Sequence, residues 1–228
     1  MVILQKEMDY NLNKIEGEQQ SPPLSGTGGD SPLGLPLPPS HFVVFDLETR
    51  HLADEVGGWK QLMSGAGGIT SLVIFDSISR EYSLYDDHTL EQAALHLESA
   101  DVVIGWNSIK FDVPTVEGHL GRKLHLKHHW DLKLALCNEV GQFTKGTGLS
   151  DTCLRTFGLS KNGSALDAPS LSRQGRFAEL FSYCINDVRL TLGATLHTIH
   201  FGFLIGPDGL RVRLKVPAQL KVNATPIS

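Results

Sequence analysis

The sequence predicts an α/β fold built from packed layers of strands and helices. Nearly continuous apolar runs at 41–47 and 101–106 are typical of buried central strands. Apolar residues recur at helical spacing in 89–99 and 176–200, and the two kinds of segment are mixed along the chain. A hydrophobic content of 41% and a charged content of 20% describe an ordinary globular protein. A length of 228 residues provides one sizeable domain and at most two.

The first expected strand, 41–47, is followed by two β-rich runs at 70–75 and 81–85 that are expected to form a hairpin. A helix at 89–99 leads to the second buried strand at 101–106. The second half is mainly helical, with a turn-forming Gly-Pro-Asp-Gly sequence near its end. The elements expected there are helices at 112–120, 131–140, 150–157 and 176–200, and a hairpin of strands 203–205 and 210–214.

The N-terminal region has a different composition from the rest of the chain. Residues 20–40 are rich in Pro, Gly and Ser, and such a segment buries too little apolar surface to offset the entropy of ordering it. We therefore expect residues 1–40 to be a disordered tail and linker, and residues 41–228 to be the folded domain. The alternative is a partner-binding motif within the tail.

Composition also limits location and partners. No apolar stretch approaches the roughly 18 residues that span a bilayer, so no membrane partner is expected. The N-terminus lacks a basic region followed by a long apolar segment, and the three cysteines are odd in number and far apart. Both features indicate a cytoplasmic protein with reduced thiols. The net charge of −5 argues against tight electrostatic binding of a long duplex.

Two acids stand at the end of the first apolar run. Asp46 and Glu48 are two residues apart, so on an extended strand both carboxylates project from the same face. Like charges this close raise each other's pKa unless a cation lies between them. The alternative is a strand that emerges into solvent with two surface acids.

Further acids occur in two later segments. Asp112 follows the second buried strand after a short turn, where it could instead cap the next helix. Tyr183 and Asp187 are four residues apart on the long helix and therefore neighbours on one face, where they could instead be ordinary surface groups. Each segment alone leaves its alternative open.

Together, these segments resemble the three sequence motifs of the DEDD superfamily of 3′–5′ exonucleases. A tyrosine four residues before the last acid resembles the DEDDy branch, as in proofreading domains of DNA polymerases, whereas the histidine branch would have its histidine at Ser182. The resemblance spans about residues 41–205 and is greatest to predicted stand-alone exonucleases related to the family B polymerase proofreading domain. The residues that carry it are Asp46-x-Glu48, Asn107-x-x-x-Phe111-Asp112 and Tyr183-x-x-x-Asp187.

This resemblance implies a ribonuclease H-like three-layer fold, with a mixed central sheet and helices on both faces. It implies hydrolysis at the 3′ end of single-stranded nucleic acid, with DNA favoured over RNA and nucleoside 5′-monophosphates released. Two Mg²⁺ or Mn²⁺ ions would assist this reaction. A helicase or polymerase is a possible protein partner. The residues implied are Asp46, Glu48, Asp112 and Asp187 as metal ligands, Tyr183 as a further catalytic residue, and Thr49, Asn107 and Phe111 in substrate binding.

Two other functions remain open at this point. The first is a non-catalytic nucleic-acid-binding or scaffolding domain of the same fold. The second is an endonuclease or resolvase, although such a site needs no tyrosine at position 183. Away from the motifs, Trp59 and Trp106 are expected to be packing residues, the alternative being platforms on which bases stack. The basic residues Lys110, Arg122, Lys123 and Lys127 could contact phosphates or simply form a solvated face.

Overall fold

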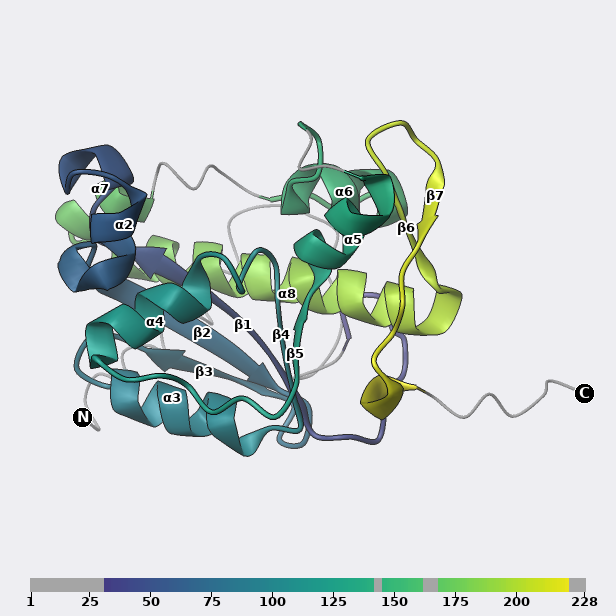
Figure 1. Cartoon of the computed structure of the whole chain (residues 1–228), viewed down its shortest axis with the longest axis horizontal. Coiled ribbons are helices and arrows are strands. Elements are labelled where there is room, and N and C mark those ends of the chain that lie inside the picture. Colours follow the sequence, from purple (N-terminus) through teal and green to yellow (C-terminus); the bar gives the residue numbers. More distant parts are fainter. Residues whose placement is uncertain (1–30, 142–144, 162–167, 222–228) are drawn as a thin grey trace, which may run out of the picture.

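A five-stranded sheet forms the centre of the computed structural model, which describes residues 31–141, 145–161 and 168–221 (Figure 1). The strand order is β3-β2-β1-β4-β5. β1 is antiparallel to β2 and parallel to β4, so the sheet is mixed, which confirms the predicted α/β class. The strands are β1 (Phe42–Thr49), β2 (Ile69–Asp76), β3 (Glu81–Tyr85), β4 (Val102–Gly105) and β5 (His129–Asp131).

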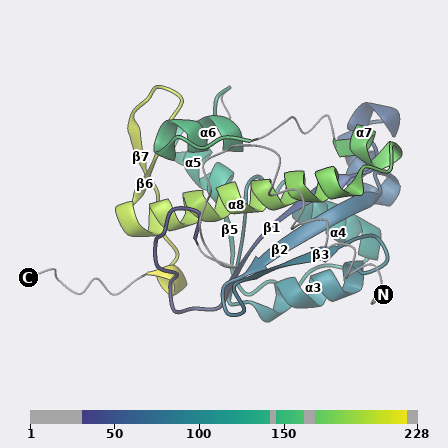
Figure 2. The same ribbon diagram turned by 180° about the vertical axis from the view of Figure 1, so that it is seen from behind.

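Helices cover both faces of this sheet (Figures 1 and 2). The long helix α8 (Phe177–Phe201) crosses one face, while α3 (Leu90–Ser99) and α4 (Asp112–Leu120) lie on the other. Beyond the β5 edge lie α5 (Leu132–Val140), α6 (Leu149–Phe157) and a two-stranded sheet of β6 (Phe203–Ile205) and β7 (Arg211–Arg213). A short helix, α7 (Ala168–Arg173), precedes α8.

The alternation of side chains along β1 creates one hydrophobic core on each face. Phe42 and Val44 belong to the core beneath α8, whereas Val43 belongs to the core beneath α3 and α4. Successive residues of a strand point to opposite faces. Asp46 and Glu48 therefore continue the row that faces α8, which is the helix that carries Tyr183 and Asp187.

The predicted elements are found with small shifts in their bounds, and three features were not predicted. β1 continues through residue 49, so both acids lie within the strand. β5, α7 and the helical turns between β1 and β2 had no prediction. Packing also begins before residue 41, because Leu35 and Leu37 contact the core under α8. Residues 1–30 lie outside the described residues, so the proposed tail and its boundary with the domain stay a prediction.

The connection between β1 and β2 packs closely against α4. It contains the turns η1 (Ala53–Glu55), α2 (Trp59–Gln61) and η2 (Leu62–Ala66). A Cβ at Gly118 of α4 would lie 1.9 Å from the carbonyl oxygen of Met63. Only glycine allows this approach, so α4 and the connection are held backbone to backbone.

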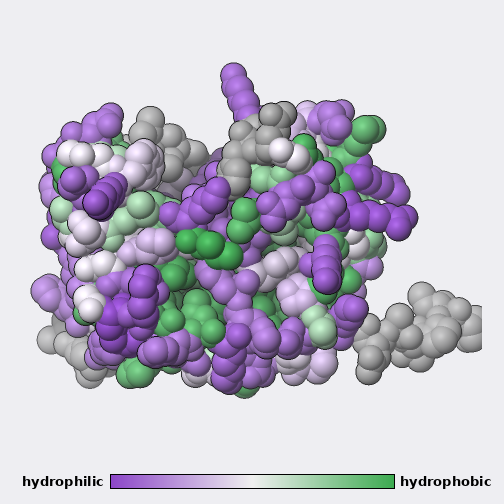
Figure 3. Space-filling model, in the orientation of Figure 1, coloured by the Kyte–Doolittle hydropathy of each residue, from purple (hydrophilic) through white to green (hydrophobic). Residues whose placement is uncertain are grey.

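The face of the molecule shown in Figure 3 is mainly hydrophilic, with apolar side chains visible in its middle. Within the described part of the chain, no helix combines the length and the apolar character that crossing a membrane requires.

Replacing Gly118 by alanine should destabilise the fold although alanine favours helices. The gain in helix propensity is about 1 kcal/mol, and the clash with the Met63 carbonyl should outweigh it and lower the free energy of unfolding by about 1–3 kcal/mol. Urea denaturation measures this change. Gly193→Ala in α8 is the control, because its Cβ meets only side chains, the nearest at 3.3 Å, and should have the smaller effect. A Gly118→Ala protein as stable as wild type would contradict the packing described.

Candidate metal centre

Two buried acids and one partly buried acid, from two elements, converge where α8 crosses β1. β1 supplies Asp46 and Glu48, and α8 supplies Asp187. Each offers an oxygen, and these oxygens all lie within 4.8 Å of one another. The thiol of Cys184 contacts the Asp46 carbonyl oxygen at 3.5 Å, which places this turn of α8 directly over β1. We call Asp46, Glu48 and Asp187 the acidic triad.

Asp112 lies beside the triad but outside this close group. It is the first residue of α4, and Phe111 occupies the N-cap position that the alternative interpretation gave to Asp112. The Asp112 carboxylate accepts a hydrogen bond from the Leu47 N–H at 3.3 Å. Its charge raises the pKa of Asp46, so the two carboxylates are electrostatically coupled. The structure therefore brings three of the four predicted acids together and places the fourth nearby.

Burial is the main reason that the pKa values of these acids are raised. It raises the pKa of Asp46 well above its ordinary value, and the charges of Asp187, Asp112 and Glu48 add to the effect. Burial and the charge of Asp187 raise the pKa of Glu48 to about 8. Burial likewise raises the pKa of Asp112 to about 7. Without a cation, the cluster therefore favours binding protons over carrying several negative charges.

Lys161 reaches this cluster, although no sequence pattern indicated it. Its ammonium group forms an ion pair with Asp187 and lies 3.3 Å from the Tyr183 hydroxyl. Burial would lower the pKa of Lys161, but the charges of Asp187 and Asp46 outweigh burial and raise it. In the sequence, Lys161 lies between two helices, α6 and α7, and belongs to no motif. Only the tertiary structure shows that it contacts an acid of the cluster.

The donor set fits a hard divalent cation. The triad offers carboxylate oxygens, which are the ligands that Mg²⁺ and Mn²⁺ prefer. The Oδ1 atom of Asp187 is buried and has no hydrogen-bond partner among the described residues. An unsatisfied buried carboxylate oxygen is costly, and a bound cation would remove that cost. The donor set of the acidic triad is therefore suited to binding a metal ion.

The three predicted substrate residues lie around the acids. Thr49 follows Glu48 at an irregularity in the β1–β2 pairing, and its hydroxyl donates to the His51 carbonyl at 2.9 Å. Asn107 has a φ of 71°, a conformation that asparagine tolerates better than most residues. Phe111 is partly buried against the core beneath α3 and α4. Their roles in substrate binding stay predictions.

The segment that contains Asn107 is held in place by Asp131. The two carboxylate oxygens of Asp131 accept hydrogen bonds from the backbone N–H groups of Asn107 and Ile109, both at 3.0 Å. The same side chain caps α5 by accepting from Leu134 N–H at 2.9 Å. One buried carboxylate thus fixes the loop between β4 and α4.

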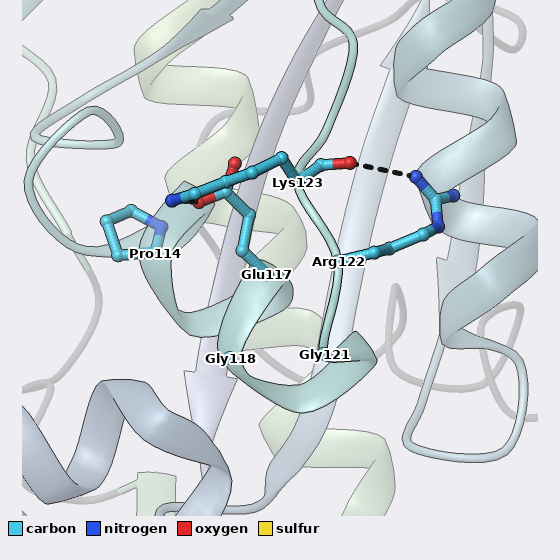
Figure 4. Close-up of a pocket in the computed structure, with 6 residues that line it drawn as sticks. All are labelled: Pro114, Glu117, Gly118, Gly121, Arg122 and Lys123. Carbon is cyan, nitrogen blue, oxygen red and sulfur yellow. Dashed lines mark hydrogen bonds and ion pairs between the residues drawn. The ribbon is translucent and has the colours of Figure 1, made fainter.

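Two expectations about residues near the site are changed by the structure. Trp106 is 8% exposed, as a packing residue should be, but Trp59 is 64% exposed, so its prediction as a packing residue is wrong. Several of the basic residues are engaged in ion pairs: Arg122 with Glu91 and Glu98, Lys123 with Glu117, and Lys127 with Asp101. Arg122, Lys123 and Glu117 also line a shallow surface hollow at the end of α4 (Figure 4).

The fold and the acids define an α/β protein of ribonuclease H-like architecture with a candidate metal centre. Part of a family B DNA polymerase from the hyperthermophilic archaeon Pyrobaculum calidifontis has a similar structure, with a TM-score of 0.55 and 19% sequence identity. The match covers 72% of this chain and 25% of the polymerase. At this identity the similarity shows the fold alone. No protein-family model matches the chain, and no curated protein does.

The raised pKa values predict an unusual dependence of stability on pH. The folded state holds protons on Glu48 up to about pH 8 and on Asp112 up to about pH 7, whereas the unfolded chain releases them near their ordinary values. The stabilisation by these protons is complete below pH 4 and is lost as pH rises through 7 and 8. In a chelator, the thermal midpoint should therefore fall by about 5 °C or more between pH 5 and 8.

Adding Mn²⁺ at pH 8 should restore the lost stability, because the cation binds the deprotonated carboxylates of the folded state alone. Differential scanning fluorimetry measures both effects. Asp46→Asn should weaken both the pH slope and the response to Mn²⁺. A flat profile in chelator together with no response to Mn²⁺ would show that these acids do not form a metal centre.

Proposed function

We propose that this protein is a metal-dependent 3′–5′ exonuclease, with residues 41–228 as its catalytic domain. The observation that carries the proposal is the convergence of the acidic triad within 4.8 Å, with Tyr183 one helical turn before Asp187. The motif resemblance to DEDDy exonucleases, including polymerase proofreading domains, supports the same activity. The fold shared with part of a family B DNA polymerase agrees with it.

The acids would hold two divalent cations, Mg²⁺ or Mn²⁺. By the motif resemblance, Asp46 would be a ligand shared by both ions, Glu48 and Asp187 would complete the site that holds the attacking water, and Asp112 would hold the second ion. Such ions supply an activated water, neutralise phosphate charge and stabilise the leaving oxygen. The close oxygens of the triad, the charge coupling of Asp112 to Asp46 and the unsatisfied Asp187 oxygen support this assignment.

Tyr183 would orient the attacking water rather than deprotonate it. Burial and the charge of Asp187 raise the pKa of the Tyr183 phenol above its ordinary value, so the hydroxyl stays protonated at neutral pH. Lys161 contacts both that hydroxyl and Asp187. Its positive charge lies where it can hold the tyrosine in place and stabilise negative charge that develops on the phosphate.

The proposed substrate is the 3′ end of single-stranded nucleic acid, with DNA favoured over RNA and nucleoside 5′-monophosphates as products. Thr49 would meet the terminal sugar, while Asn107 and Phe111 would position the strand end. The proposed setting is cytoplasmic, with a helicase or polymerase as a possible partner. This proposal favours catalysis over a scaffolding role because the metal-binding acids and the tyrosine are all present.

Asp46→Asn should reduce nucleotide release by a thousandfold or more while leaving the fold intact, because the shared ligand of both ions is lost. The assay follows end-labelled single-stranded DNA and RNA with Mg²⁺, with Mn²⁺ and with chelator. Asp208→Asn, an exposed acid in the β6–β7 turn, is the control and should keep full activity. Full activity of Asp46→Asn would refute the mechanism, and cleavage of circular single-stranded DNA would indicate an endonuclease.

Lys161→Met should lower kcat by about 10- to 100-fold, the worth of one charge-assisted hydrogen bond at a reacting group. Lys161→Arg keeps the charge and should recover part of that loss. Lys215→Met, which removes an exposed lysine after β7, should leave kcat unchanged. Steady-state kinetics on a single-stranded oligonucleotide separate the variants. An unchanged kcat in Lys161→Met would mean that this lysine only balances charge in the metal-free fold.

A further inference from the structure

Trp59 is an aromatic side chain with no evident structural reason to be exposed. Its side chain is 64% exposed, whereas the other two tryptophans, Trp106 and Trp130, are 8% and 7% exposed. Leaving so large an apolar ring in water forgoes the stabilisation that burial would give. The stability of the fold therefore does not explain why Trp59 is exposed.

The segment that carries Trp59 is held firmly. The Leu62 N–H donates to the Gly58 carbonyl at 3.0 Å, and the Leu62 side chain is buried. The following turn, η2, meets α4 at Gly118 with no space for a side chain between the two backbones. On the other side, Glu55 of η1 forms an ion pair with Arg173 of α7 at 3.1 Å. The ring is therefore presented on a braced support.

The Trp59 ring also contacts the edge of the proposed active site. It packs edge-to-face with Phe111, with the ring centroids 5.7 Å apart and the planes at 85°. Phe111 immediately precedes Asp112, whose carboxylate is coupled to Asp46. Two perpendicular rings form a corner in which a flat group stacked on one ring presents its edge to the other.

We propose that Trp59 is a stacking residue for a nucleobase close to the 3′ end of the substrate strand. The proposal rests on the proposed exonuclease function and identifies a binding contact outside the three motifs. A base would stack on the exposed face of Trp59 with its edge toward Phe111. Because every base has a π face, this contact is tolerant of sequence, but it requires an unpaired and unstacked base.

The charge distribution favours stacking over phosphate contacts as the source of affinity here. The chain carries a net charge of −5. Arg122, Lys123 and Lys127 are already engaged with acids of the protein. An extended basic surface normally dominates affinity for nucleic acids. A stacking contact, which needs no basic side chain, is therefore a suitable source of affinity for the strand.

Matched substrates with and without a base test the proposal. Single-stranded oligonucleotides would carry one abasic nucleotide at the last, second-last or third-last position, so that the phosphodiester is kept and only the base is lost. Trp59→Ala should raise KM for the intact strand by about tenfold, the usual worth of one stacked base. That increase should vanish for the strand whose missing base is the one that stacks, and Trp59→Phe should show a smaller increase.

Leu210→Ala removes another exposed apolar side chain, in the β6–β7 turn, and should leave KM unchanged. Because Trp59 is exposed, its replacement should not unfold the protein, and the thermal midpoint checks this. An unchanged KM in Trp59→Ala, or an equal rise for the intact strand and all three abasic strands, would overturn the proposal.

A second measurement does not depend on catalysis. In the Asp46→Asn protein, titration with an eight-nucleotide oligothymidylate should quench the emission of Trp59, which is the exposed tryptophan of the three. Asp46→Asn combined with Trp59→Phe should lose that quenching. Quenching by Trp59 without turnover by wild type would retain the stacking role and refute the exonuclease. Turnover without quenching would retain the exonuclease and refute the stacking role.

Discussion

The repulsion among buried carboxylates is the constraint on which the rest of this structure depends. Asp46, Glu48 and Asp187 lie within 4.8 Å of one another, and Asp112 adds a fourth charge nearby. Water screens charges poorly in such a place, so the arrangement can persist only with protons or cations among the acids. Within the described chain, Lys161 is the cation that reaches them. One ammonium cannot balance four acids, so the remaining negative charge favours the binding of a cation.

The fold provides this arrangement with ordinary elements. The alternation of β1 directs two acids toward the same face on which Phe42 and Val44 pack. α8 crosses that face and is fixed by a long hydrophobic contact, so Asp187 is placed by the packing of apolar residues around it. The core thus holds the acids in place, and no flexible loop is needed to bring them together. Because their placement is rigid, the acids cannot move apart to relieve their mutual repulsion.

Periodicity was enough to predict the α/β class and most of the strands and helices, whereas the three-layer arrangement and the metal-binding roles of the acids were implied by the motif resemblance. The apolar runs gave the central strands, and the spacing of Asp46 and Glu48 gave a shared face, because both follow from local geometry. The placement of Lys161 could not be predicted, since it depends on tertiary contacts with Tyr183 and Asp187, which are distant in the sequence. The three-residue strand β5 was too short to show a pattern.

Trp59 was misjudged for a related reason. An aromatic residue in a sequence favours burial, and only the tertiary structure shows that this one lies 64% exposed. Short turns such as those between β1 and β2 show almost no periodic pattern of apolar residues. Whether a residue in such a turn is buried or exposed is therefore decided by the tertiary structure.

The two-faced character of β1 also determines where the gene can tolerate insertions and deletions. Removing one residue between Phe42 and Phe45 would exchange the faces of every later side chain in the strand. Both carboxylates would then turn toward the apolar underside of α3, and Phe45 and Leu47 would take their place beneath α8. Added codons in the turn at 77–80 would leave that parity intact. Changes of length should therefore accumulate in the connections of related sequences and be purged from this one strand.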